Sequence, residues 1–151
     1  MSARSLAQAV TGWSAAAFVA AAAVACSGGS ESAPLPRISS VVAERDVVDG
    51  EAKLSSTVKV TLDREFEIAQ GRVPFASNFE FTVPLAEGGT ARVLVRSAER
   101  ESNSTRVITL KVDRLIAHGS TLKVQRRAFD PEETGAIEAE VEADLDPTFV
   151  L

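Results

Sequence analysis

The stretch of sequence that decides the fold class is TVKVTLD, residues 57–63. Its apolar side chains, Val58, Val60 and Leu62, occupy every second position, and the positions between them are polar. An alternation with a period of two places the apolar side chains on one face of an extended strand. We therefore predict a β-strand here, with one face in a core and the other in solvent.

The same alternation recurs along most of the remaining chain. It predicts further strands at residues 38–43, 79–83, 91–97, 105–112, 122–124 and 137–145. Turn-forming residues separate several of them, including Gly88-Gly89 and the run ESNS at 101–104. The irregular stretch 64–77 has room for a short helical turn. About seven short strands with regularly spaced turns predict an all-β fold of two facing sheets.

Four segments, taken in their order and spacing, resemble the bacterial immunoglobulin-like domains of surface-layer and cell-wall proteins (the SbsA-like type). These segments are the strand 57–63, the step ASNF at 76–79, the strand 105–112 and the segment 115–124. The resemblance extends over residues 38–145. It implies an Ig-like Greek-key β-sandwich of about seven strands. It also implies a non-catalytic spacer, adhesion or scaffold module, and it names no ligand.

Residues 1–25 have the composition of a cleaved signal peptide. Arg4 is the only charged residue among residues 1–30, and residues 6–25 form an uncharged, alanine-rich stretch. That stretch ends in AVAC at positions 23–26, and small side chains before a cleavage point suit a signal peptidase. The segment therefore predicts export.

Cys26 is the only cysteine of the chain, and it stands where a bacterial lipoprotein carries its lipid. We predict lipidation of Cys26, a flexible tether over 26–36, the Ig-like domain over 37–146 and a C-terminal tail over 147–151. Two alternatives stay open: ordinary secretion after cleavage at the same bond, and a retained membrane span. Lipidation would place the domain in the bacterial cell envelope, on the outer membrane of a two-membrane cell, facing the periplasm or the exterior.

The charge balance beyond the leader argues against nucleic acid as a partner. The chain has 16 Lys and Arg, of which Arg4 is one, so 16 − 1 = 15 basic residues face 21 acidic ones, a net of 15 − 21 = −6. Phosphate binding depends on clustered basic residues. The expected partners are the membrane, through the lipid anchor, and an unidentified envelope protein or cell-wall polymer.

The alternative function is a β-sandwich that binds a glycan or calcium. Trp13 lies in the leader and the chain has no Tyr, so Phe is the only aromatic side chain of the domain. Exposed Trp or Tyr platforms for sugar rings are therefore absent from the sequence. Of the phenylalanines, Phe79 and Phe81 are expected in the core because they alternate with polar residues.

A row of carboxylates on the last predicted strand is the first candidate metal site. The row consists of Glu138, Glu140, Glu142, Asp144 and Asp146. Calcium takes about six to eight oxygen ligands, whereas same-face residues of one strand stand about 7 Å apart. We expect the row to meet polar and basic side chains of the preceding strand, namely Lys123, Gln125 and Arg127.

The loop acids Asp130, Glu132 and Glu133 form a second candidate, but their spacing matches no EF-hand loop. Turn-forming acids are common in such loops. We therefore predict no metal-binding residues in this segment either.

Two other groups are candidates for catalysis. His118 is followed by Ser120 and Thr121, which places a base near hydroxyls. A triad also needs an orienting acid and an oxyanion hole, and zinc needs further ligands beside one histidine. The acids Asp63, Glu65 and Glu67 suggest glycosidase chemistry, but a small domain has little room for opposed carboxylates in a cleft. We therefore predict no enzyme activity, no cofactor and no metal.

Overall fold

The computed structural model describes residues 34–69 and 74–143. These residues fall within one compact unit, 33–151. Cys26, the leader, most of the tether, and Asp144, Asp146 and the tail lie outside the described residues.

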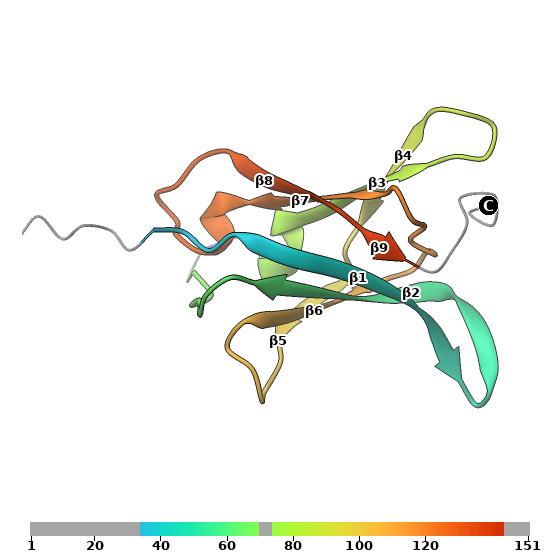
Figure 1. Cartoon of the computed structure of the whole chain (residues 1–151), viewed down its shortest axis with the longest axis horizontal. Helices are drawn as coiled ribbons and strands as arrows, with labels where there is room; N and C mark the ends of the chain where they lie inside the picture. The colour runs from blue at the N-terminus through green and yellow to red at the C-terminus, as the bar shows by residue number, and fades with distance from the viewer. Residues whose placement is uncertain (1–33, 70–73, 144–151) are drawn as a thin grey trace, which may run out of the picture. The chain divides into compact units, whose positions relative to one another are not determined.

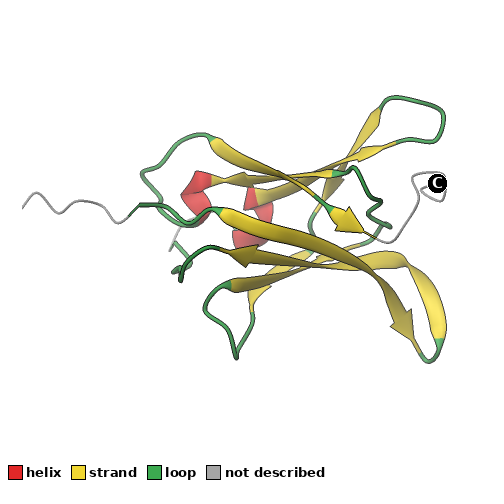
Figure 2. Cartoon of the chain, viewed as in Figure 1, coloured by secondary structure: helices red, strands yellow, loops and turns green. Residues whose placement is uncertain are grey.

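The described chain folds into two sheets that face each other, with two short 3-10 helices (Figures 1 and 2). One sheet has the strand order β5-β6-β2-β1-β9, and the other has the order β4-β3-β7-β8. The bounds of the first sheet are β1 Ile38–Val48, β2 Glu51–Leu62, β5 Ser97–Arg100, β6 Val107–Val112 and β9 Glu142–Ala143. Those of the second are β3 Phe79–Pro84, β4 Thr90–Leu94, β7 Thr121–Gln125 and β8 Ala136–Glu140. The prediction of an all-β sandwich is confirmed.

The core lies between the sheets and is built from the alternating positions that the sequence indicated. Val58, Val60 and Leu62 of β2 are buried, and they meet the buried Phe79 and Phe81 of β3 across the sandwich in one apolar cluster. Burying an aromatic or branched aliphatic side chain contributes about 1.5–3 kcal/mol each. The expected core positions of Phe79 and Phe81 are therefore confirmed.

The first two strands form a hairpin that is much longer than expected. β1 and β2 pair from Ile38 opposite Leu62 to Val48 opposite Glu51. The turn between them is Asp49-Gly50, with φ values of 55° and 81°. A two-residue turn with positive φ at both positions matches the twist of the flanking strands, and Asp-Gly suits it well. The end of this hairpin projects beyond the rest of the sandwich (Figure 1).

Two predicted strands are each divided between the two sheets, so the described chain has nine strands rather than about seven. The segment predicted as one strand over 91–97 is β4 in one sheet and β5 in the other, with a break at 95–96. The last predicted strand breaks at Val141: β8 pairs with β7, and β9 pairs in parallel with β1. Each break lets one segment contribute to both sheets.

Buried polar contacts hold the connection between β6 and β7. Leu115, Ile116 and Ala117 in this connection are buried. The backbone N–H of Ile116 donates to Oγ of the buried Ser56 on β2, at 2.9 Å. The irregular stretch before β3 holds the 3-10 helix η1, Phe75–Asn78, as the sequence indicated, and η2, Arg126–Ala128, follows β7.

Candidate functional site

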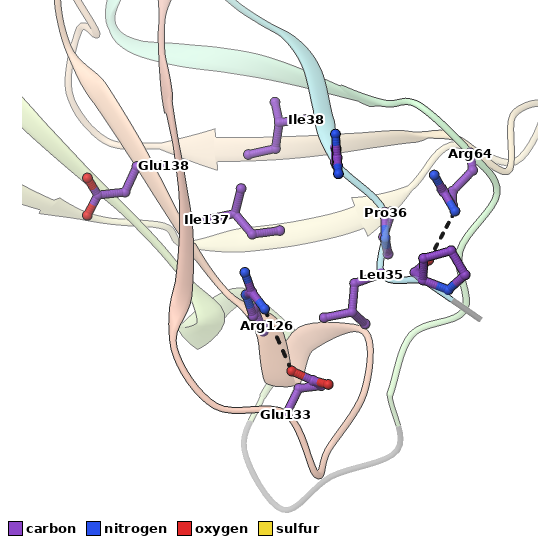
Figure 3. A pocket seen from close by; sticks show the side chains of 10 residues that line it. Leu35, Pro36, Ile38, Arg64, Arg126, Glu133, Ile137 and Glu138 are labelled. Carbon is purple, nitrogen blue, oxygen red and sulfur yellow. Dashed lines mark hydrogen bonds and ion pairs between the residues drawn. The ribbon is translucent and has the colours of Figure 1, made fainter. Parts of the chain in front are cut away.

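A groove of about 490 Å³ lies at the end of the domain where the described chain begins, between the first residues of β1 and the first residues of β8 (Figure 3). Leu35, Ile38 and Ile137 provide its apolar lining, and all three are half-buried. Arginine and glutamate side chains surround them. The groove therefore combines an apolar floor with a charged rim.

The first wall of the groove is the entering chain, which is fixed to the end of β2. The Arg64 guanidinium donates to the carbonyl of Pro34 at 3.2 Å and to the carboxylate of Asp63. The same carboxylate accepts the backbone N–H of Arg37 at 2.8 Å. These bonds from Arg64 and then Arg37 hold the pKa of Asp63 below its ordinary 3.8. Residues 34–37 therefore pack on the domain, and Pro36 is buried.

The opposite wall comes from η2, the following loop and β8. Arg126 points toward Glu133 across the loop, with 3.8 Å between the guanidinium nitrogen and the carboxylate oxygen (Figure 3). Glu138 pairs with Lys123 of β7 at 3.8 Å. These exposed pairs contribute about 0–1 kcal/mol each. Their effect here is to set the charge pattern of the rim.

Both strands beside the groove have an unpaired edge. β8 ends its sheet, so among the described strands only β7 bonds to it. β1 pairs with β9 only at Val42 and Ala43, so its edge over residues 38–41 has no partner strand in the described chain. In Figure 1 the two strands approach each other near β9 and diverge toward the chain entry. The groove occupies this wedge.

Two hydrogen bonds fix the direction in which the backbone groups of β8 point. Arg126 N–H donates to the carbonyl of Gly135 at 3.0 Å, and Val141 N–H donates to that of Ser120 at 2.8 Å. In an antiparallel ladder, the residues that bond to the partner strand alternate with residues that face away. Of the β8 residues, Ile137 and Ala139 therefore bond to β7, and the backbone N–H and C=O groups of 136, 138 and 140 face the open edge.

A second exposed surface is apolar and belongs to two hairpins. The six large apolar side chains that the described structure leaves exposed all belong to the two hairpins β1–β2 and β3–β4: Val42, Val47, Val48, Leu54, Leu85 and Leu94. Leu54 is 80% exposed. Leu54 lies on the same face of β2 as the buried residues Val58 and Val60, but beyond the part of that face that the second sheet covers. The projecting hairpin thus carries an uncovered apolar side.

A polar cluster holds the base of that projecting hairpin. Asp46 accepts hydrogen bonds from Thr57 and, at 2.9 Å, from Ser55, and Lys111 Nζ lies 3.8 Å from its carboxylate. Burial is the largest single effect on this carboxyl and raises its pKa. The bonds from Thr57 and Ser55, together with the charge of Lys111, outweigh burial, so the pKa of Asp46 lies below its ordinary 3.8.

The predicted row of carboxylates is divided by the break at Val141. Glu138 and Glu140 lie on β8 in one sheet, while Glu142 lies on β9 in the other. The expectation that the row occupies one face of one strand is therefore wrong, because the chain changes sheets within it. Among the described members of the row, the pairing with the preceding strand is confirmed for Glu138, which pairs with Lys123.

The neighbouring residues that were expected to meet the row have other positions. Gln125 lies opposite Ala136, and Arg127 donates to Asn78 Oδ1 at 3.0 Å. In the loop, Asp130 accepts the backbone N–H of Glu132 at 3.0 Å, whereas Glu133 pairs with Arg126. The described ranges gather no set of three or more His, Cys, Asp or Glu side chains able to hold a metal ion.

The candidate catalytic residues are not brought together. His118 is exposed in a turn with Gly119, Thr121 begins β7, and Ser120 is fully buried with no partner for its hydroxyl among the described residues. Asp63 is engaged by Arg64 and Arg37. Glu65 and Glu67 are exposed and line a separate pocket together with Phe66.

Comparisons with protein-family models, with curated proteins and with solved structures find no match for this chain. Within the part of the chain that the structure describes, no helix has both the length and the apolar character needed to cross a membrane.

Proposed function

We propose that this chain is an exported bacterial lipoprotein. In this account a lipid on Cys26 anchors one Ig-like Greek-key β-sandwich, which acts as a non-catalytic structural, adhesion or protein-interaction module of the cell envelope. The observation that carries the address is the position of the only cysteine, directly behind an uncharged alanine-rich leader and the small residues 23–25. Two or more acyl chains anchor a protein stably, at about 0.8 kcal/mol for each buried CH₂.

The strand order supports the immunoglobulin-like part of the proposal. If β1, β2, β3, β5, β6, β7 and β8 are lettered A to G in chain order, the two sheets become D-E-B-A and C-F-G. An Ig constant-type sandwich has the strands ABED in one sheet and CFG in the other. The additional strand β4 then lies beside C, and β9 continues G onto A.

The binding role rests on the groove. It lies beside the point where the tether enters, between two unpaired strand edges, and it has an apolar floor and a charged rim. Small-molecule sites are usually enclosed concave pockets, whereas this groove is open along a strand edge. An open strand edge fits a binding module for protein segments.

Fractionation of cells that express the full chain tests the address. The native protein should be recovered with membranes, and Cys26→Ser should move it to the soluble exported fraction. Ser30→Ala, which changes the tether and keeps the cysteine, serves as the matched control and should stay with membranes. Retention of the Cys26→Ser protein in membranes would contradict the lipid anchor and favour a retained span.

A further inference from the structure

We infer that the groove binds an extended peptide segment of a partner protein, which adds as a strand to the open edge of β8. This inference rests on the proposed role as an interaction module and names the class of its partner. Strand addition uses main-chain hydrogen bonds for affinity and pockets for alternate side chains for specificity. The groove offers both features.

The main-chain partners come from β8. The N–H and C=O groups of residues 136 and 138 face away from β7, because the hydrogen bonds of Gly135 and Val141 determine which alternate residues of β8 bond to β7. A strand that lies along this edge would satisfy these groups. The second unpaired edge, over residues 38–41 of β1, forms the other side of the same wedge.

The apolar floor determines which side chains the peptide should carry. Leu35, Ile38 and Ile137 are half-buried and line the hollow from two segments, the chain entry that leads into β1 and the first residues of β8 (Figure 3). Every second side chain of an added strand would point toward this floor. The expected peptide therefore alternates apolar residues with polar ones over four to six positions.

The rim determines the charge of the peptide. Three guanidiniums line the groove, of which those of Arg64 and Arg126 pair with Asp63 and Glu133. Within the described ranges the backbone N–H of Arg37 bonds to Asp63, but its exposed side chain forms no ion pair and no hydrogen bond. A carboxylate on the peptide is the complementary group, since arginine binds carboxylates through charge-assisted bonds.

The charges of β8 also argue against a second copy of this chain as the occupant. Glu138 and Glu140 are exposed on β8. Antiparallel pairing of this edge with its own copy, centred on Glu138 or Ala139, would bring glutamates opposite glutamates, and like charges in that position are destabilising. A peptide whose acidic residue lies beside Arg37, and whose apolar residues face the floor, avoids that repulsion.

The test is selection of short random peptides displayed on phage against the purified full-length protein. Enriched peptides should share alternating apolar positions and an acidic residue. Glu138→Pro removes one outward-facing N–H at an edge position where proline is tolerated, and it should weaken their binding about five- to tenfold. Glu138→Thr, which removes the carboxylate and keeps the N–H, is the matched control and should bind at least as well as the native protein.

N-methylation of a selected peptide tests the pairing without changing the protein. Every second amide of the added strand faces β8, and the amides between them face away. Methyl groups on the amides that face β8 should therefore abolish binding, and methyl groups on the other amides should leave the affinity unchanged. Equal loss for both parities, equal binding to Glu138→Pro, or failure to enrich any peptide would overturn the inference. Light scattering that shows a dimer lost in Glu138→Pro would overturn it in favour of a second copy.

The membrane fractionation of Cys26→Ser is independent of all these outcomes. The inference can therefore fail while the anchor stands, and the anchor can fail while the groove binds its peptides.

Discussion

Two buried serines should respond in opposite ways when their hydroxyls are removed. Ser56 and Ser120 are both fully buried. Ser56 Oγ accepts the buried N–H of Ile116 at 2.9 Å, whereas Ser120 Oγ has no partner among the described residues. The substitutions Ser56→Ala and Ser120→Ala remove the same atom from the same kind of environment. The two variants differ in whether the lost hydroxyl oxygen had a hydrogen-bond partner.

The expected magnitudes follow from the groups left behind. Ser56→Ala leaves the Ile116 N–H buried without an acceptor, which costs about 1–3 kcal/mol of the free energy of unfolding. Ser120→Ala removes an unsatisfied polar group, so the free energy of unfolding should stay the same or rise by up to about 1 kcal/mol. The free energies of unfolding of the two variants should therefore differ by about 1–4 kcal/mol.

Urea denaturation of the purified protein, followed by far-UV circular dichroism, measures this difference. With a denaturant slope of about 2 kcal/mol/M, a loss of about 2 kcal/mol lowers the midpoint by about 1 M. The midpoint of Ser120→Ala should match or exceed that of the native protein. A Ser120→Ala midpoint as low as that of Ser56→Ala would refute the assignment of these bonds.

Three further predictions concern acid, apolar and metal dependence. The pKa values of the Asp46 and Glu80 carboxyls lie below their ordinary 3.8 and 4.5, because Thr57 donates a hydrogen bond to Asp46 and Arg92 donates one to Glu80. The two ionised carboxylates therefore stabilise the fold at pH values above their pKa values in the unfolded chain. The urea midpoint should therefore fall as pH drops below about 5, and Asp46→Asn should reduce that fall; equal pH dependence in the variant would contradict this. Leu54→Ser should change the free energy of unfolding by less than about 0.5 kcal/mol, since this side chain is 80% exposed. By contrast, alanine at the fully buried Leu122 should cost about 2–5 kcal/mol in the same urea assay, and similar costs for both would show that the projecting hairpin is covered. Calcium or a chelator should leave the melting temperature unchanged, whereas a shift with calcium would favour the calcium-binding alternative.

The sequence predicted the strands that carry a clean alternation, because burial on one face is a local property of each strand. It did not predict the break at Val141. Ala139, Val141 and Ala143 keep the same parity on both sides of the break, so the pattern is continuous while the pairing partner changes from β7 to β1. Only long-range pairing distinguishes one strand from two in such a segment.

The long β1–β2 hairpin had a local signal that the strand assignment did not use. Asp49-Gly50 is a strong two-residue turn signal between Val47-Val48 and the residues that begin β2. The alternation is interrupted near Asp46, where the register of the hairpin shifts. This turn signal predicts that the strands on either side of Asp49-Gly50 form one hairpin.

The groove could not be predicted from any one segment. Its lining comes from the chain entry, the end of β2, η2 and β8, which are distant in the sequence. The sequence assigned residues 34–36 to a tether and residues 130–135 to a loop. Their common site exists only because Arg64 and Asp63 fix the entering chain beside the diverging edge of β8.

The intact mass of the protein purified from membranes of an expressing bacterium is the decisive measurement for lipidation of Cys26. A lipidated protein has the mass of residues 26–151 plus a diacylglycerol group, with or without an added N-acyl chain. The mass of residues 26–151 alone would contradict lipidation and indicate ordinary secretion, and a mass that includes residues 1–25 would contradict cleavage and indicate a retained span.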